Sequence, residues 1–194
     1  MVKVVFLHPD LGIGGAERLV VDAALALKAK GHEVDLVTSH HDKGHCFAET
    51  RDGTLPVHAV ADWIPRSILG RAMAACAYIR MVATALWLVT LSDLKPKVIF
   101  VDQISACIPV LRMFSTAKIV FYCHFPDQLL TQRETTLKSV YRMPLDWLEE
   151  VTTGMADTVL VNSRFTGPKS SARPFSRLAN EFLIRSRWNF PRHV

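Results

Sequence analysis

One stretch near the N-terminus limits the fold more than any other part of the sequence. An apolar run over residues 2–7 leads into a turn that carries Gly12, Gly14 and Gly15, and a helical pattern follows at once. A run that is nearly all apolar is typical of a strand buried on both faces in a parallel sheet. A second strand is expected at 33–38, so the stretch is a strand–helix–strand unit, whose short connections favour a doubly wound sheet.

The glycine turn is also a candidate ligand site. Backbone N–H groups at a helix N-terminus attract phosphate, and glycine tolerates positive φ and allows close approach. The spacing does not match the dinucleotide fingerprint, because Glu17 stands where its third glycine belongs. An acidic residue there competes with phosphate for the helix dipole. The turn alone therefore predicts either a phosphate site or only a tight connection.

Composition restricts the possible classes of protein. The chain has 194 residues, 49% of them hydrophobic, which suits one globular domain with a sizeable core. Its net charge of +5 comes from residues 167–194, which hold six basic residues against Glu181 alone. The rest is neutral, so the charge does not indicate a basic nucleic-acid face. We expect 167–194 to be a poorly ordered basic tail, with binding to acidic surfaces as the alternative.

No metal site or disulfide framework is expected. The four cysteines stand far apart without a C-x-x-C spacing, and their apolar neighbours predict buried, reduced thiols. The segment 40–53 carries three histidines and Asp42, but it lacks the fixed spacing of a helical zinc pair, so a solvated loop is favoured. No signal peptide is evident, since the first apolar run is too short for one.

Residues 67–91 are expected to form one long helix with almost no polar face. A helix that is apolar all round is either buried or in contact with lipid. The uninterrupted apolar run after Arg80 is too short to span a bilayer. Two interpretations stay open: a core or interdomain helix, or a helix in a membrane surface that Arg80, Trp87 and Leu88 contact.

Polar side chains follow the expected strands at the same edge of the sheet. The further strands are expected at 56–60, 97–101, 118–123 and 157–161. Asp102 and Gln103 follow one of them, and His124 and Asp127 follow the next. Ligands of parallel sheets bind at the carboxyl ends of the strands, so these groups and the glycine turn predict one site. His124 follows apolar residues and is expected to titrate or donate near neutral pH; the alternative is that it only caps its strand. His8, at the end of the first strand, is interpreted as loop-shaping.

Several stretches together resemble one family. They are 8–18, 44–47, 102–109, 122–127, 154–157 and 161–166. They are similar to glycosyltransferase family 4, and within it to the eukaryotic mannosyltransferases of asparagine-linked glycosylation. The resemblance implies an α/β fold, a Rossmann-like parallel sheet with helices on both faces, as the N-terminal half of a GT-B glycosyltransferase. This domain is expected to cover residues 1–166.

The resemblance also implies an activity. Family enzymes of this kind transfer mannose from GDP-mannose, in α-1,3 and α-1,6 linkage and with retention, to a dolichol-diphosphate-linked oligosaccharide. The reaction takes place on the cytosolic face of the endoplasmic reticulum membrane without a catalytic metal or cofactor, and other glycosyltransferases of the pathway are candidate partners. By similarity, Gly12, Gly14 and Gly15 lie beside the donor diphosphate, and His124 lies at the reaction centre. The remaining residues that it places along the cleft are Asp102, Gln103 and Asp127.

The resemblance ends at Thr166. The C-terminal donor-binding domain of the family is not recognisable after it, and we interpret 167–194 as the product of a shifted or alternatively spliced reading frame. On this hypothesis the chain is inactive by itself. One alternative is a non-catalytic fragment that binds a membrane or the full-length enzyme. Another is a nucleotide-dependent oxidoreductase, against which Glu17 and the lack of an acidic residue after the second strand argue.

Overall fold

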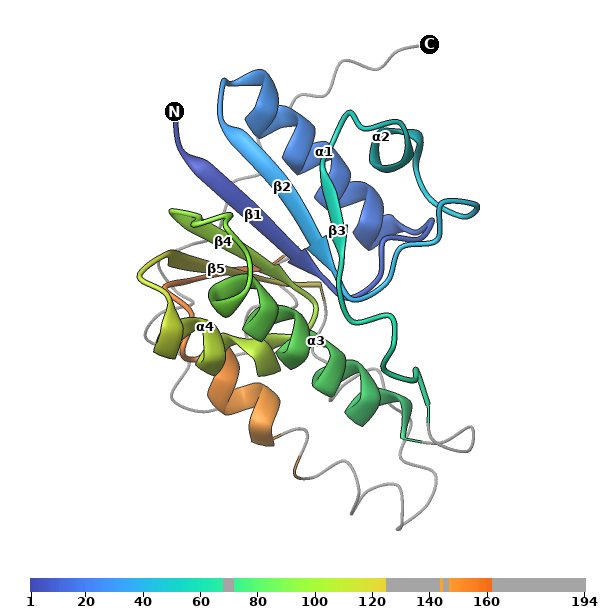
Figure 1. The fold of residues 1–194 in the computed structure, drawn as a ribbon. Coiled ribbons are helices and arrows are strands. Elements are labelled where there is room, and N and C mark those ends of the chain that lie inside the picture. Colours follow the sequence, from blue (N-terminus) through green and yellow to red (C-terminus); the bar gives the residue numbers. More distant parts are fainter. Residues whose placement is uncertain (68–71, 125–143, 145–146, 162–194) are drawn as a thin grey trace.

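The computed structural model describes residues 1–67, 72–124, 144 and 147–161. Within this part of the chain, six parallel strands form one sheet in the order β3-β2-β1-β4-β5-β6 (Figure 1). The strands are β1 (Lys3–His8), β2 (Glu33–Thr38), β3 (Val57–Ala59), β4 (Val98–Asp102), β5 (Lys118–Cys123) and β6 (Thr158–Val161). The helices are α1 (Gly15–Ala29), α2 (Ala48–Arg51), α3 (Met73–Thr90) and α4 (Ile108–Phe114), with a 3₁₀ turn η1 (Ser105–Cys107) before α4.

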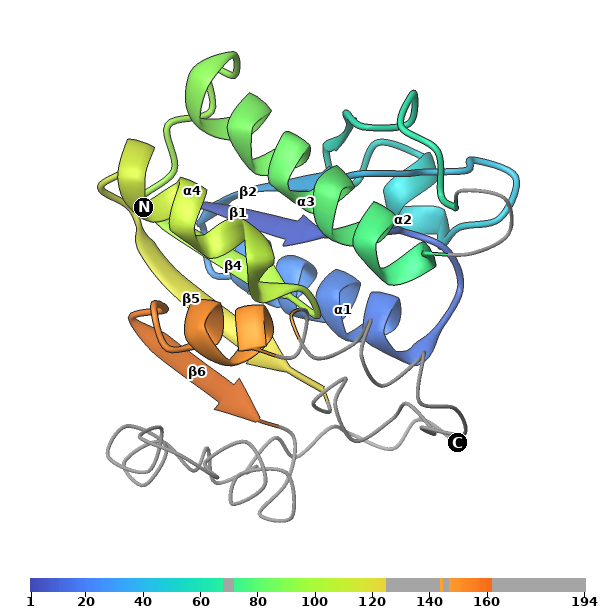
Figure 2. The same ribbon diagram turned by 90° about the horizontal axis from the view of Figure 1, so that it is seen from below.

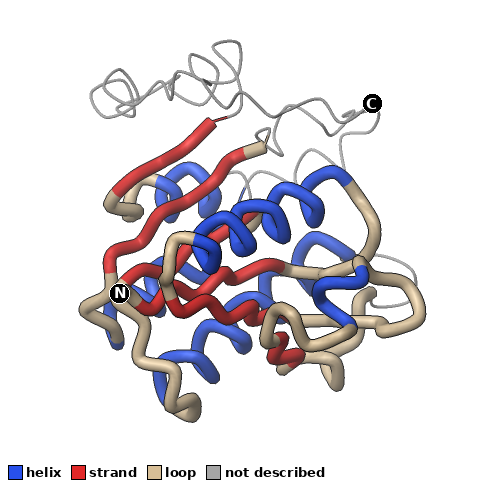
Figure 3. The backbone as a smooth tube through the Cα atoms, turned by 90° about the horizontal axis from the view of Figure 1, so that it is seen from above, coloured by secondary structure: helices blue, strands red, loops and turns tan. Residues whose placement is uncertain are grey.

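Helices cover both faces of the sheet, as Figures 2 and 3 show. Alternate residues of β1 point to opposite faces, as they do in any strand. Val5 and Leu7 belong to the core under α3 and α4, and Val4 and Phe6 belong to the core under α1. The doubly wound α/β fold is therefore confirmed, and the predicted strands are confirmed to within two residues at each end.

Two helices differ from their predictions. The segment 40–53, expected to be a loop because of its polar composition, contains the short helix α2. Helix α3 begins at Met73, because Ala72 has the left-handed φ of 56° and Ser67 is not helical; residues 68–71 lie outside the described part. Residues 147–153 are helical as well. The four cysteines are buried, as predicted.

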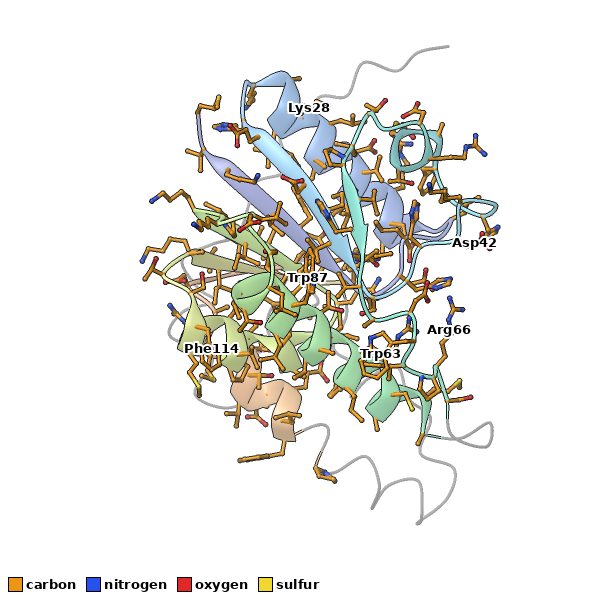
Figure 4. The ribbon with its side chains drawn as sticks, in the orientation of Figure 1. Lys28, Asp42, Trp63, Arg66, Trp87 and Phe114 are labelled. Atoms are coloured by element: carbon orange, nitrogen blue, oxygen red, sulfur yellow. The ribbon has the colours of Figure 1, made fainter. Side chains whose placement is uncertain are left out.

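Helix α3 packs one side into the core, and this corrects the proposed membrane contacts. Leu88 is 3% exposed and Arg80 is 6% exposed. Nη2 of Arg80 donates to the backbone oxygen of Ser39 at 2.8 Å and lies 3.5 Å from a carboxylate oxygen of Asp62. Trp87, labelled in Figure 4, is partly buried against the same core. The prediction that Arg80 and Leu88 contact lipid is wrong, because both side chains are buried on the side of the helix that packs into the core.

The other side of α3 is apolar and exposed. It carries Ile79 and Leu86, whereas Met73 is exposed at the N-terminal end of the helix, on the side of Arg80. By length and composition alone, α3 is the one helix in the described residues that reaches the hydropathy of a membrane span, with 39% of its residues buried. Core helices of soluble proteins reach the same hydropathy, so the composition of α3 does not by itself distinguish the two settings.

Candidate functional site

The candidate site lies where the winding of the sheet reverses. From β1 the chain winds outward to β2 and β3, and after α3 it returns to β4 on the other side of β1. At such a switch point the connections leave in opposite directions, so the carboxyl ends of the two central strands border a crevice. Here those strands are β1 and β4, which end at His8 and Asp102.

The strand register brings His8 and Asp102 together. Phe6 pairs with Phe100 and Leu7 with Val101, so the next position sets His8 beside Asp102. Nδ1 of His8 lies 2.8 Å from Oδ2 of Asp102. Each of the two side chains is 1% exposed. At this distance the two side chains form a buried ion pair when His8 is protonated.

His124 completes the group from the next strand. It follows β5, and its Nε2 lies 3.0 Å from Oδ1 of Asp102 and 3.2 Å from Oδ2. The ring of Tyr122 contacts the His124 ring edge to face, with centroids 4.7 Å apart. The His124 side chain keeps 27% of its surface exposed. Asp102 therefore anchors a histidine that a ligand can still reach.

Glu17 approaches the group from helix α1. Its Oε1 lies 3.6 Å from Nε2 of His8, so His8 stands between two carboxylates. The Glu17 carboxylate also folds back over Gly14, at the first turn of α1: a Cβ added to Gly14 would lie 2.2 Å from Oε2. A carboxylate is favourable there, because it faces the positive end of the helix dipole.

The pKa values of the group shift in a consistent way. Burial alone would lower the pKa of His8, but its contacts with Asp102 and Glu17 outweigh burial and raise the pKa from 6.5 to about 9. Burial opposes ionisation of Asp102, yet His124 and His8 hold its pKa below the ordinary value. The contact with His8 likewise lowers the pKa of Glu17. The group thus holds a buried imidazolium between two carboxylates at neutral pH.

The other predicted site residues that the structure describes also lie at the carboxyl ends of the strands, but they make fewer contacts with His8, Asp102 and His124. Gln103 is exposed and has a left-handed φ of 64°, which turns the chain sharply after β4. Among the loop glycines the structure brings Gly14 into contact with the group, through Glu17, and Gly15 has open space beside it. A Cβ added to Gly12 would lie 3.8 Å from Cδ2 of the His45 ring. Asp127 lies outside the described residues.

Sequence reasoning missed His8 as a member of the site. It was interpreted as loop-shaping because the order of the strands in the sheet was unknown. Once β1 is placed next to β4, the two strand ends, His8 and Asp102, are necessarily neighbours. The reason proposed for the glycines was incomplete too: Gly12, Gly14 and Gly15 do not have positive φ. Gly14 instead leaves room for the side chain of Glu17.

These contacts make different predictions for two adjacent glycines. Gly14→Ala is expected to push the Glu17 carboxylate away from His8, because Cβ and Oε2 cannot stand 2.2 Å apart. The lost contact favours the neutral imidazole, so the pKa of His8 should fall, as NMR titration would measure. Gly15→Ala is the matched control, since no atom lies within 4 Å of its Cβ. Equal pKa values of His8 in the two variants would contradict this packing.

Two of the three histidines in the segment 40–53 contact neighbouring side chains. His40 pairs with Asp62, and Nε2 of His41 lies 3.3 Å from Oγ1 of Thr50. Among the described residues, no group of three His, Cys, Asp or Glu side chains is placed to hold a metal ion.

Comparison with protein families matches residues 13–168 to the family described as Glycosyltransferase Family 4. The match covers most of the chain and includes Gly14, Gly15, Asp102 and His124. The chain belongs to glycosyltransferase family 4. Residues 13–168 thus correspond to a recognised family unit that holds Glu17, Asp102 and His124 of the site, whereas β1 and His8 precede the matched range.

Three curated proteins similar to this family 4 chain share the name alpha-1,3/1,6-mannosyltransferase ALG2. The protein of Homo sapiens is 59% identical over 189 residues, covering 95% of this chain and 45% of its own length. That of Rhizomucor pusillus is 57% identical over 164 residues, covering 84% and 36%. That of Saccharomyces cerevisiae is 48% identical over 179 residues, covering 92% and 35%. The chain spans less than half the length of these relatives.

Solved structures share the fold of this family 4 chain. Sucrose-phosphate synthase of Thermosynechococcus elongatus superposes with a TM-score of 0.60 at 16% identity, over 84% of this chain and 43% of that one. The catalytic domain of starch synthase IV of Arabidopsis thaliana, bound to ADP and acarbose, gives 0.53 at 18% identity, over 73% and 39%. At such identities the likeness shows the fold alone, which is the N-terminal Rossmann-like half of the GT-B fold.

Proposed function

We propose that this chain forms one wall of a mannosyltransferase site. In this site mannose passes from GDP-mannose to a dolichol-diphosphate-linked oligosaccharide, in α-1,3 and α-1,6 linkage. The main observation behind this proposal is that His124 contacts buried Asp102 and is still partly exposed at the switch point of the sheet. The shared name of relatives at 48–59% identity supports the choice of mannose over other sugars.

His124 is the proposed catalytic residue of this wall. Asp102 holds its Nε2, so Nδ1 is the nitrogen that remains for a ligand. We propose that this nitrogen contacts a hydroxyl of the transferred mannose and orients the sugar for transfer. GDP-mannose brings the mannosyl group already activated through its diphosphate, so the proposal includes no resident cofactor or metal.

The donor diphosphate is proposed to lie beside Gly15 rather than over Gly14. The Glu17 carboxylate occupies the space over Gly14, and a second anion would be repelled there. The space next to Gly15 is open, and it lies at the same helix N-terminus, where backbone N–H groups favour anions.

An exchange of N-terminal halves tests the proposal. Residues 1–166 would replace the matching segment of the Saccharomyces cerevisiae relative, and the chimera would be assayed for mannose transfer from GDP-mannose to a lipid-diphosphate acceptor. We expect transfer by the chimera and its loss with His124→Ala. The same exchange with the human segment is the positive control. A folded chimera without transfer, beside an active control, would overturn the proposed function.

A membrane position is proposed through the exposed side of α3. A lipid-linked acceptor requires access to a membrane surface, and Ile79 and Leu86 present apolar side chains away from the core. In the proposed setting this surface is the cytosolic face of the endoplasmic reticulum. An apolar helix face of this kind gains free energy when it enters the interface of a bilayer.

Two charged replacements on that face should weaken membrane binding. We expect Ile79→Glu with Leu86→Glu to reduce flotation of the chain with liposomes several-fold, because carboxylates disfavour burial among acyl chains. The matched control adds the same two charges at Ala29 and Thr54, which are exposed on the other side of the domain. Equal flotation of both variants would exclude this face as the contact.

A further inference from the structure

The histidine at the end of β1 has no role in the proposed reaction, yet its side chain is as deeply buried as that of Asp102. His8 is buried between Asp102 of β4, with Nδ1 2.8 Å from Oδ2, and Glu17 of α1, with Nε2 3.6 Å from Oε1. On the β5 side, His124 and Tyr122 flank Asp102. Every charged group that faces His8 in the described residues is thus acidic.

Asp102 is shared between two imidazoles that differ in their surroundings. A buried carboxylate needs a counter-charge, because burial without one is costly. His8 contacts two carboxylates and is shielded from solvent, whereas His124 contacts one carboxylate and is partly exposed. The balancing proton is therefore better placed on His8, and the raised pKa of His8 agrees with this.

We propose that His8 is a positioning residue: as a buried cation it balances Asp102, which lets His124 bind the same carboxylate as a neutral Nε2–H donor with Nδ1 unprotonated. The tautomer follows from the geometry, because the nitrogen that faces Asp102 is Nε2. An imidazole that shares its carboxylate with a cation need not carry the charge itself. This role of His8 rests on the proposed function in one respect, the contact between Nδ1 of His124 and a hydroxyl of the transferred mannose.

The charge of His8 also connects the site to the glycine turn. Glu17 lies over Gly14 where it contacts His8, so the same ion pair connects the first turn of α1 to the strand ends. His8 thus holds two parts of the proposed cleft in one arrangement: the anchored His124 and the helix N-terminus beside Gly15.

Two-bond ¹H–¹⁵N spectra of the histidine-labelled 194-residue chain test the inference without any substrate. At pH 7.5 we expect His8 to show two protonated nitrogens, persisting until the pH nears 9, and His124 to show Nε2–H with a bare Nδ1. In His8→Gln, His124 is expected to become doubly protonated at pH 7.5, since it then faces Asp102 alone. The control, His58→Gln, removes a similar contact with Asp35 at 3.0 Å and should leave His124 unchanged.

Two results would overturn the inference. One is a neutral His8 at pH 7.5 in the unmodified chain, which remains measurable even if His8→Gln does not fold. The other is a folded His8→Gln chain in which the His124 pattern does not change. Failure of the chimera to transfer mannose would refute the proposed function and leave these spectra as they are, so the two failures are distinguishable.

Discussion

Asp102→Asn is expected to destabilise the chain by about 3 kcal/mol at pH 7, the loss that follows when one partner of a buried ion pair is removed. Asparagine keeps the shape of the side chain but not its charge. His8 would then be buried as a cation with Glu17 as its remaining acidic contact, or would have to release its proton. Urea unfolding followed by tryptophan fluorescence measures the change.

Asp22→Asn is the matched control for Asp102→Asn. Asp22 pairs with Arg18 one helical turn away, on the surface of α1. Exposed pairs of this kind contribute about 0.5 kcal/mol or less. A loss of less than about 1 kcal/mol for Asp102→Asn would show that the buried group does not hold the strand ends together.

The chain is expected to lose about 3 kcal/mol of stability between pH 6.5 and pH 10 through His8 alone. The folded protein binds the His8 proton with a pKa of about 9, against 6.5 in the unfolded chain. The resulting stabilisation is complete below pH 6.5, where both states are protonated, and is lost as the pH rises through 9. A difference of about 2.5 pKa units corresponds to the stated free energy. Urea unfolding at a series of pH values measures it.

The variant His8→Gln isolates this contribution. Burial also raises the pKa of the Cys107 thiol, to about 12, so the unfolded chain ionises first and stability falls above pH 9 for that reason too. This second loss is the same in both proteins, and the difference between their pH profiles belongs to His8. Parallel profiles from pH 6.5 to pH 10 would contradict the ion pair.

The parts of the fold that depend on local pattern were predictable. The apolar run before the glycine turn and the apolar strands at 97–101 and 118–123 gave the parallel sheet, and the polar residues after them marked its functional edge. The position of His8 was not predictable in the same way, because its contact depends on which strands are neighbours. The buried side of α3 was likewise ambiguous: a helix apolar all round does not reveal which residues face the sheet, and the burial of Arg80 is decided by Ser39 and Asp62.

Backbone conformation explains the remaining difference. Glycines in a turn usually suggest positive φ, and Gly31 and Gly53 have it, but the glycines of the turn after β1 do not. Positive φ occurs instead at Gln103, where the chain leaves β4, and at Ala72, where it enters α3. Gly14 serves a side chain three residues away instead. Such a close approach leaves no signature in the sequence apart from the acidic residue itself, Glu17.

The central claim, that ligands bind at the carboxyl ends of β1, β4 and β5, is tested most directly by mapping binding on the amide spectrum of the 194-residue chain. GDP-mannose and a short-isoprenoid diphosphate oligosaccharide would be titrated separately. We predict that at least one of them shifts the signals of Gly15, Gln103 and His124 most strongly. Shifts confined to the opposite edge, where Lys97 and Ala117 line a separate pocket before β4 and β5, would contradict the account.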